Sequence, residues 1–131
     1  MIVIDASVLA NVISDDGDDG DLARSEFRSA DDVAAPDLVD VETVAVLRKR
    51  RLAGSITARR FASAITDLES IAIARYPTLP LMRRAFELRA SVTSYDAAYV
   101  ALAELLNCEL LTGDGRLGGA PGPACSIRAL R

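Results

Sequence analysis

The chain has 131 residues, half of them apolar, which suits one domain with a substantial core over residues 1–131. Its formal net charge of -4 argues against a protein that coats nucleic acid with bulk positive charge. No stretch is long and apolar enough to cross a bilayer, and no basic segment precedes the apolar start, so we expect no membrane association and a cytoplasmic protein.

Short apolar segments alternate with amphipathic ones along the chain. Residues 2–5 predict a buried parallel strand, because they are apolar and β-branched without alternation. A helix over residues 7–13 follows. Residues 14–21, rich in Asp and Gly, predict an exposed loop, with a gate beside a site as the alternative. The remaining elements are predicted as helices at 21–30, 37–52, 57–68, 81–90 and 95–106, strands at 33–35, 71–74, 110–112 and 126–130, and a loop at 113–123.

This alternation of short strands with helices predicts an α/β fold with a mainly parallel sheet. Ligand chemistry in such folds gathers outside the carboxyl ends of the strands. Asp5 and Asp114 both lie at predicted strand ends. A functional site is therefore expected at that edge of the sheet.

Four acids occupy positions where a charge is costly: Asp5, Glu42, Asp96 and Asp114. Each has an ordinary explanation. Asp5 could cap the helix after it, and Glu42 could lie at the edge of the apolar helix stripe formed by Leu38, Val39, Val41, Ala45 and Val46. Asp96 could complement a helix dipole, and Asp114 stands in a Gly-Asp-Gly turn.

Together the four acids point to a metal. Carboxylates that converge on one sheet edge repel one another, and some stay protonated near neutral pH unless a cation screens them. The chain has no His, so a hard divalent cation such as Mg²⁺ or Mn²⁺ is the simplest solution. Such a site suits attack of a metal-bound water on a phosphodiester.

With these residues in place, the sequence resembles the PIN-domain ribonucleases, and among them the VapC-type toxins of bacterial toxin-antitoxin pairs. The matching segments are residues 2–8, 35–48, 94–103 and 111–117. The resemblance implies a PIN-like three-layer fold with a parallel sheet of about five strands in the order 3-2-1-4-5, flanked by helices. It also implies Mg²⁺-dependent endonucleolytic cleavage of RNA.

The resemblance assigns roles residue by residue. Asp5, Glu42 and Asp96 would be the main metal-holding acids, and Asp114 would complete the pocket directly or through water. Ser7 and Thr112 would orient ligands or bound water, although helix capping and an ordinary strand position explain them equally well. A homodimer and a cognate VapB-type antitoxin, whose C-terminal segment would lie across the site, are also implied.

For RNA binding, Arg116 is the best single candidate for a phosphate contact because it is close to Asp114. The basic clusters at residues 48–51, 59–60 and 83–84 could also follow an RNA backbone, or they could be solvated helix faces. The helices near residues 81–88 and 99–106 could expose an apolar stripe for dimerisation, or bury it in the core.

Other classes fit less well. A signalling receiver domain needs a lysine at a late strand end, and the only lysine, Lys49, is in a predicted helix. A phosphatase of the Asp-x-Asp type fails at Ser7, and Pro121 prevents the helix that a dinucleotide motif at residues 113–118 requires. Cysteines 108 and 125 are too few and too far apart for a zinc motif or disulfide scaffold. The alternative that remains is a non-catalytic PIN-like binding module.

Overall fold

Five parallel strands form one sheet in the order β3-β2-β1-β4-β5, in a computed structural model that describes residues 1–130. The strands are β1 (Ile2–Ile4), β2 (Val33–Pro36), β3 (Ala74–Tyr76), β4 (Glu109–Thr112) and β5 (Ile127–Ala129). Every neighbouring pair is parallel. The predicted fold class and strand order are therefore confirmed.

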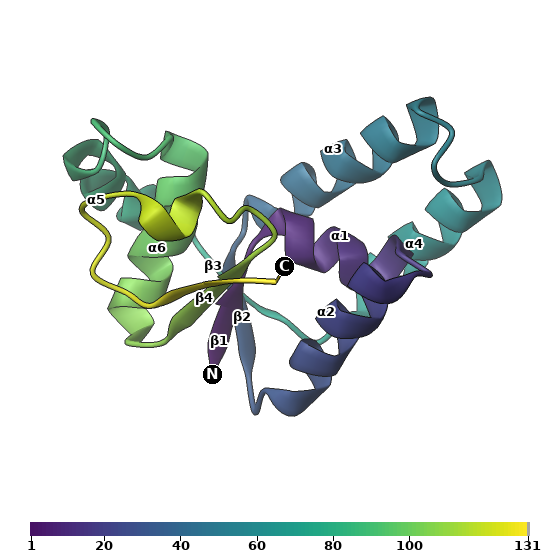
Figure 1. The fold of residues 1–131 in the computed structure, drawn as a ribbon, viewed down its shortest axis with the longest axis horizontal. Helices are drawn as coiled ribbons and strands as arrows, with labels where there is room; N and C mark the ends of the chain where they lie inside the picture. Colours follow the sequence, from purple (N-terminus) through teal and green to yellow (C-terminus); the bar gives the residue numbers. More distant parts are fainter. Residues whose placement is uncertain (131) are drawn as a thin grey trace.

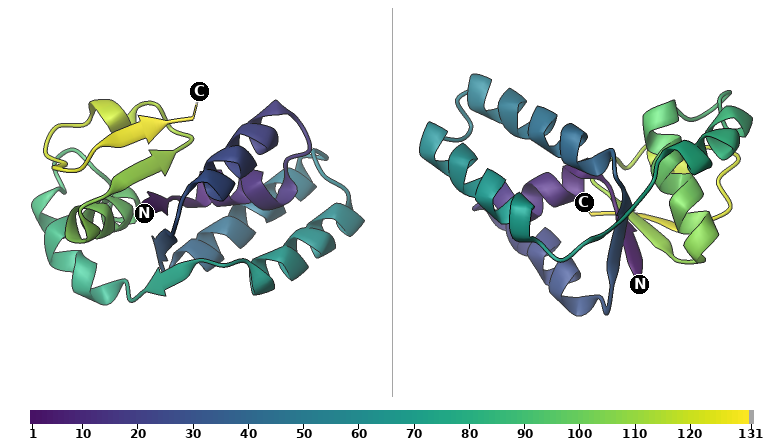
Figure 2. Two further views of the ribbon diagram at one scale, coloured as in Figure 1. Left: turned by 90° about the horizontal axis from the view of Figure 1, so that it is seen from below. Right: turned by 180° about the vertical axis from the view of Figure 1, so that it is seen from behind.

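Helices cover both faces of this sheet (Figures 1 and 2). They are α1 (Ala6–Ser14), α2 (Asp18–Ser29), α3 (Val39–Leu52), α4 (Ala58–Ser70), α5 (Met82–Glu87) and α6 (Ser94–Leu106), with short 3-10 turns η1 (Leu79–Leu81) and η2 (Leu117–Gly119). Helices α1 to α4 lie on one side, and α5 and α6 lie on the other. The result is a three-layer arrangement with the sheet in the middle.

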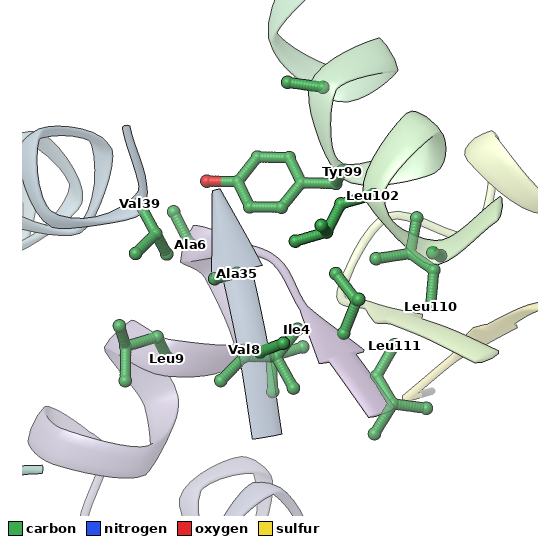
Figure 3. Packing of buried hydrophobic residues seen from close by; sticks show 14 of the residues in the cluster. Ile4, Ala6, Val8, Leu9, Ala35, Val39, Tyr99, Leu102, Leu110 and Leu111 are labelled. Carbon is green, nitrogen blue, oxygen red and sulfur yellow. The ribbon is translucent and has the colours of Figure 1, made fainter. Parts of the chain in front are cut away.

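The core lies where the central strands meet α1 and α6. Val3, Ile4, Leu110 and Leu111 are buried on both faces of the sheet, as expected for parallel strands covered by helices. In α6 every residue from Ala97 to Ala103 is buried, so the middle of this helix is enclosed on all sides. Figure 3 shows these side chains packed around the strands.

The acidic segment after α1 is mostly helix, so the prediction of a loop over residues 14–21 was wrong. Helix α2 begins at Asp18, and three acids in its first turn complement the positive end of the helix dipole. Gly20 is buried against α1, where an added Cβ would lie 1.8 Å from the Asp15 carbonyl oxygen. The glycine therefore serves close packing rather than mobility.

The third strand was also misplaced. Residues 71–74 carry the β-branched pattern of a strand, but β3 begins at Ala74, where its pairing with Ala34 starts. Ile71 and Ile73 pack against the core from the preceding connection. The helix predicted at residues 81–90 is shorter as well, since α5 ends at Glu87. In residues 1–130, no helix is both long and apolar enough to span a membrane.

Candidate functional site

The four predicted acids lie at the carboxyl edge of the sheet. Asp5 follows β1, and Asp114 comes two residues after β4, which pairs with β1. Glu42 lies in the first turn of α3, after β2, and Asp96 in the first turn of α6. Because β2, β1 and β4 are neighbours in the sheet, these positions converge.

The Asp5 carboxylate accepts hydrogen bonds from the helix that follows it, α1, and from the neighbouring strand β4. Its Oδ1 accepts a hydrogen bond of 2.6 Å from the Ser7 hydroxyl and one of 3.1 Å from the Val8 backbone N–H, so it caps α1. Its Oδ2 accepts a short hydrogen bond from the Thr112 hydroxyl. Both oxygens of a buried carboxylate are thus satisfied, and the capping interpretation and a role in a site are compatible.

Thr112 and Ser7 also hold the loop that carries Asp114. The Thr112 hydroxyl oxygen accepts a hydrogen bond of 3.0 Å from the Asp114 N–H, and the Ser7 hydroxyl oxygen accepts one of 2.9 Å from the Gly113 N–H. An added Cβ at Gly113 would lie 2.9 Å from the Ser7 hydroxyl oxygen, so only glycine fits without displacing that side chain. The backbone at Asp114 is therefore fixed to the start of α1.

The Asp114 carboxylate pairs with Arg116. Its Oδ1 accepts hydrogen bonds of 2.9 Å from the Arg116 backbone N–H and 3.2 Å from Arg116 Nε. These bonds hold the pKa of Asp114 below its usual range. The Arg116 side chain is 93% exposed, so its guanidinium reaches solvent at the rim of the acid cluster.

Glu42 is half-buried and receives a hydrogen bond of 2.6 Å from the Tyr99 hydroxyl. Burial raises the pKa of Glu42, the Tyr99 hydrogen bond opposes this, and the charges of Asp96 and Asp5 add to the rise. Burial and the neighbouring Glu42 also raise the pKa of Tyr99, so this phenol stays a hydrogen-bond donor. Figure 3 shows the Tyr99 hydroxyl pointing from α6 toward the start of α3.

The sequence did not reveal Tyr99 as a partner of Glu42. The available signal was its position three residues after Asp96, on the same face of α6. The apolar stripe expected around Glu42 was also wrong in part, because Val41 is 76% exposed and Ala45 is exposed too. The buried face of α3 consists of Val39, Thr43 and Leu47, and Glu42 lies beside it.

Asp96 is the acid most affected by the others. Burial raises its pKa, and the charges of Asp5 and Asp114 raise it further. A hydrogen bond with Thr93, the residue that caps α6, and the charge of Arg116 act in the opposite direction. The four predicted acids are therefore close enough to influence one another electrostatically.

Electrostatic interaction among the four acids does not by itself make a metal-binding site. Among residues 1–130, no three acidic, His or Cys side chains lie close enough together to hold a metal ion as they stand. What the arrangement provides is a set of oxygen donors at one sheet edge, with two carboxylates whose pKa values are raised by burial and by like charge. Such groups are functional-site candidates.

Comparison with known proteins shows the family to which the chain is similar. The PIN domain model matches residues 2–122. The VapC ribonuclease Mb0985 of Mycobacterium bovis is 39% identical over 130 residues, covering 97% of this chain and 96% of the relative. The structure of Mycobacterium tuberculosis VapC20, a sarcin-ricin loop cleaving toxin, matches with a TM-score of 0.70 at 18% identity, covering 91% of this chain and 94% of that one. VapBC2 from Rickettsia felis matches with a TM-score of 0.68 at 14% identity over 100% of both chains.

Proposed function

This chain belongs to the PIN domain family, and on that premise we propose that it is a metal-dependent endoribonuclease, the toxin of a toxin-antitoxin pair. The relative of 39% identity that covers nearly the whole chain is itself a VapC ribonuclease, which supports RNA as the substrate. The observation that carries the proposal is the meeting of Asp5, Glu42, Asp96 and Asp114 at one sheet edge, where burial and the neighbouring carboxylates raise the pKa values of Glu42 and Asp96.

The residues present fit a divalent cation. All four candidate ligands are carboxylates, the donors that Mg²⁺ and Mn²⁺ prefer, and these ions keep several water ligands and so need few protein groups. Burial raises the pKa values of Asp96 and Glu42, and the repulsion from other carboxylates that adds to this rise would be offset by a cation bound near them. Asp5, Glu42 and Asp96 would be the principal ligands, with Asp114 a ligand directly or through water.

The bound cation would supply a water of lowered pKa as nucleophile and positive charge next to the phosphate. The chain's own residues orient the ligands. Thr112 and Ser7 donate hydrogen bonds to the two oxygens of Asp5, which fixes the direction in which its remaining lone pairs point. Tyr99 does the same for Glu42, and Arg116 lies where it could contact a phosphate oxygen.

We extend the proposal to partners. Likeness to the VapC ribonucleases supports a cognate VapB-type antitoxin that covers the site. A homodimer is supported by apolar side chains that the fold leaves exposed on η1, α5 and α6: Leu79 at 82%, Phe86 at 55% and Leu105 at 70%. Most apolar residues of the helices near 81–88 and 99–106 are buried in the core, which is the alternative expected for them, and we assign the exposed side chains that remain to the contact between two copies.

The test of the activity is cleavage of total RNA with and without Mg²⁺, using the native chain and Asp96→Asn. We expect fragments only with the native protein and the cation, because Asp96→Asn removes a ligand and keeps the shape of the side chain. A circular dichroism spectrum that is unchanged in the variant controls for folding. Equal cleavage by both proteins would refute the mechanism, and intact RNA with native protein and Mg²⁺ would favour the non-catalytic binding module.

A further inference from the structure

A groove of about 850 Å³ begins at the acid cluster and runs along α1 toward the end of α3 and the start of α4. Ser7 and Gly113, which belong to the candidate site, line its near end. Ser7, Asn11 and Ser14 follow one another at helical spacing and form a polar stripe along the groove side of α1. The stripe leads from the acids to Arg50 of α3.

Arg50 is fixed in this groove by two neutral partners. Its Nη1 donates a hydrogen bond of 2.9 Å to the Ser14 hydroxyl, and its Nη2 donates one of 2.6 Å to the Asn11 side-chain oxygen. Ser14 is 2% exposed, and its own hydroxyl donates to the Ala10 carbonyl at 2.7 Å. These bonds orient the guanidinium and leave its positive charge without an anionic partner.

This state is unusual in the part of the chain that the structure describes. One group of arginines forms ion pairs: Arg24, Arg60, Arg75, Arg84, Arg116 and Arg128. The remainder apart from Arg50 are exposed: Arg28, Arg48, Arg51, Arg59, Arg83 and Arg89. Among residues 1–130, Arg50 alone is both partly buried and without a carboxylate within ion-pair distance. A cation in this position is costly unless an anion joins it.

Two acidic residues farther along the groove, Asp15 and Asp16, have hydrogen-bond partners. Asp16 accepts hydrogen bonds of 3.1 and 3.0 Å from Arg60, which forms an ion pair with it. Asp15 Oδ1 accepts from the N–H groups of Gly17 and Gly20, at 2.8 and 3.1 Å. Asp19 also lines the groove, and of the two arginines that line it, Arg60 pairs with Asp16, so Arg50 is the one without a carboxylate within ion-pair distance among the described residues.

The geometry points to Arg50 as a ligand for an RNA phosphate that neighbours the one being cut, with Asn11 and Ser14 as its positioning residues. Choice of RNA as the occupant rests on the proposed function, since the groove begins at the acids that would cut the chain. Arginine suits phosphate because its planar fork can bind two oxygens. Two turns of α1 separate Ser7 from Ser14, about 10 Å, so the phosphate at Arg50 belongs to another nucleotide.

The test measures the salt dependence of RNA binding. Fluorescence anisotropy with a labelled random-sequence RNA of ten nucleotides is recorded over a KCl series without divalent cations, so that no cleavage occurs. The proteins are the native chain, Arg50→Gln, Arg50→Lys, and Arg28→Gln as an exposed, unpaired control with the same charge change. Thermal unfolding and cleavage of the same RNA with Mg²⁺ are measured in parallel.

We expect the plot of the logarithm of the RNA association constant against the logarithm of the salt concentration to be flatter by about 0.7 in Arg50→Gln than in the native protein. The ratio of native to variant affinity should therefore fall about 2.5-fold between 50 and 200 mM salt. Arg50→Lys and Arg28→Gln should keep the native slope. An unchanged slope in Arg50→Gln, equal flattening in Arg28→Gln, or no RNA binding by the native chain would overturn the inference. If the native protein binds RNA through Arg50 but does not cleave it with Mg²⁺, the proposed nuclease activity is refuted and the phosphate contact of Arg50 is retained. If the native protein cleaves RNA but the salt slope does not depend on Arg50, the phosphate contact is refuted and the nuclease activity is retained. Binding of a protein partner in the groove, without binding of RNA there, would also contradict the RNA subsite.

Discussion

Thr112→Val isolates the hydroxyl that connects two of the candidate acids. Thr112 is fully buried at the end of β4, and valine has nearly the same shape. The substitution removes the donor to the Asp5 carboxylate and the acceptor of the Asp114 N–H. We therefore expect it to reduce both stability and cleavage.

The loss can be worked out from these two hydrogen bonds. A hydrogen bond to a charged group contributes about 1.5–3 kcal/mol, and one between neutral groups about 0.5–1.5 kcal/mol, so the free energy of unfolding should fall by roughly 2–4 kcal/mol. Unfolding entropy of about 2.1 cal/mol/K per residue makes 1 kcal/mol correspond to roughly 3.6 °C in a chain of 131 residues. The midpoint should fall by about 7–15 °C, and cleavage by about 10- to 100-fold because Asp5 loses orientation.

Thr43→Val is the matched control. Thr43 is also fully buried, and its hydroxyl is a buried side-chain oxygen without a hydrogen-bond partner among residues 1–130. Removing it should raise the free energy of unfolding by about 1 kcal/mol and leave cleavage unchanged. Urea or thermal unfolding followed by circular dichroism measures both variants. Equal changes in the free energy of unfolding of the two variants, or native stability in Thr112→Val, would show that the hydrogen bond from Thr112 to Asp5 does not stabilise the protein.

The remaining predictions concern charge and packing. Glu42 and Asp96 have raised pKa values in the folded protein, so their contribution to stability is fully present below the ordinary carboxyl pKa and is lost as pH rises through the raised values. Asp96→Asn should therefore unfold at higher urea than the metal-free native chain at pH 7, and the difference should disappear on acidification; a difference that grows below pH 4 would contradict this. Asp5→Asn should instead lower stability by about 1–3 kcal/mol, because the amide has one oxygen where the carboxylate accepts at two, so either Thr112 or the Ser7 and Val8 donors lose their acceptor, and urea titration distinguishes the two variants. Gly20→Ala should cost about 2 kcal/mol or more, since its Cβ would lie 1.8 Å from the Asp15 carbonyl oxygen, and a midpoint within 1–2 °C of native would refute that packing.

The two strands that lead to Asp5 and Asp114 could be predicted because strand ends leave strong signals in the sequence. Residues 2–4 and 110–111 are uninterrupted apolar runs, and each is followed within three residues by an acid that a buried element would not tolerate. The strand order came from the likeness to a family rather than from these patterns. Local patterning alone does not determine which parallel strands become neighbours.

Prediction failed where tertiary contacts outweighed local composition. The run of Asp and Gly before α2 is typical of a loop, yet the acids suit the start of a helix and Gly20 allows it to pack closely on α1. The face of α3 was misjudged because Val41 is apolar but exposed, while the polar Thr43 is buried. Tyr99 is buried in the core, and only the packed structure brings its hydroxyl to Glu42.

The hydrogen bond from Thr112 to Asp5 joins residues 107 positions apart in the chain. During synthesis β1 emerges early, but its partner β4 and the loop with Asp114 emerge only after most of the other elements. Contacts of such large sequence separation form late, after the loop-closure entropy has been met. A nascent chain that ends before Thr112 therefore lacks both the donor that orients Asp5 and the last acid. For the proposed nuclease, we therefore expect activity only after β4 has paired with β1 and Asp114 has reached the site.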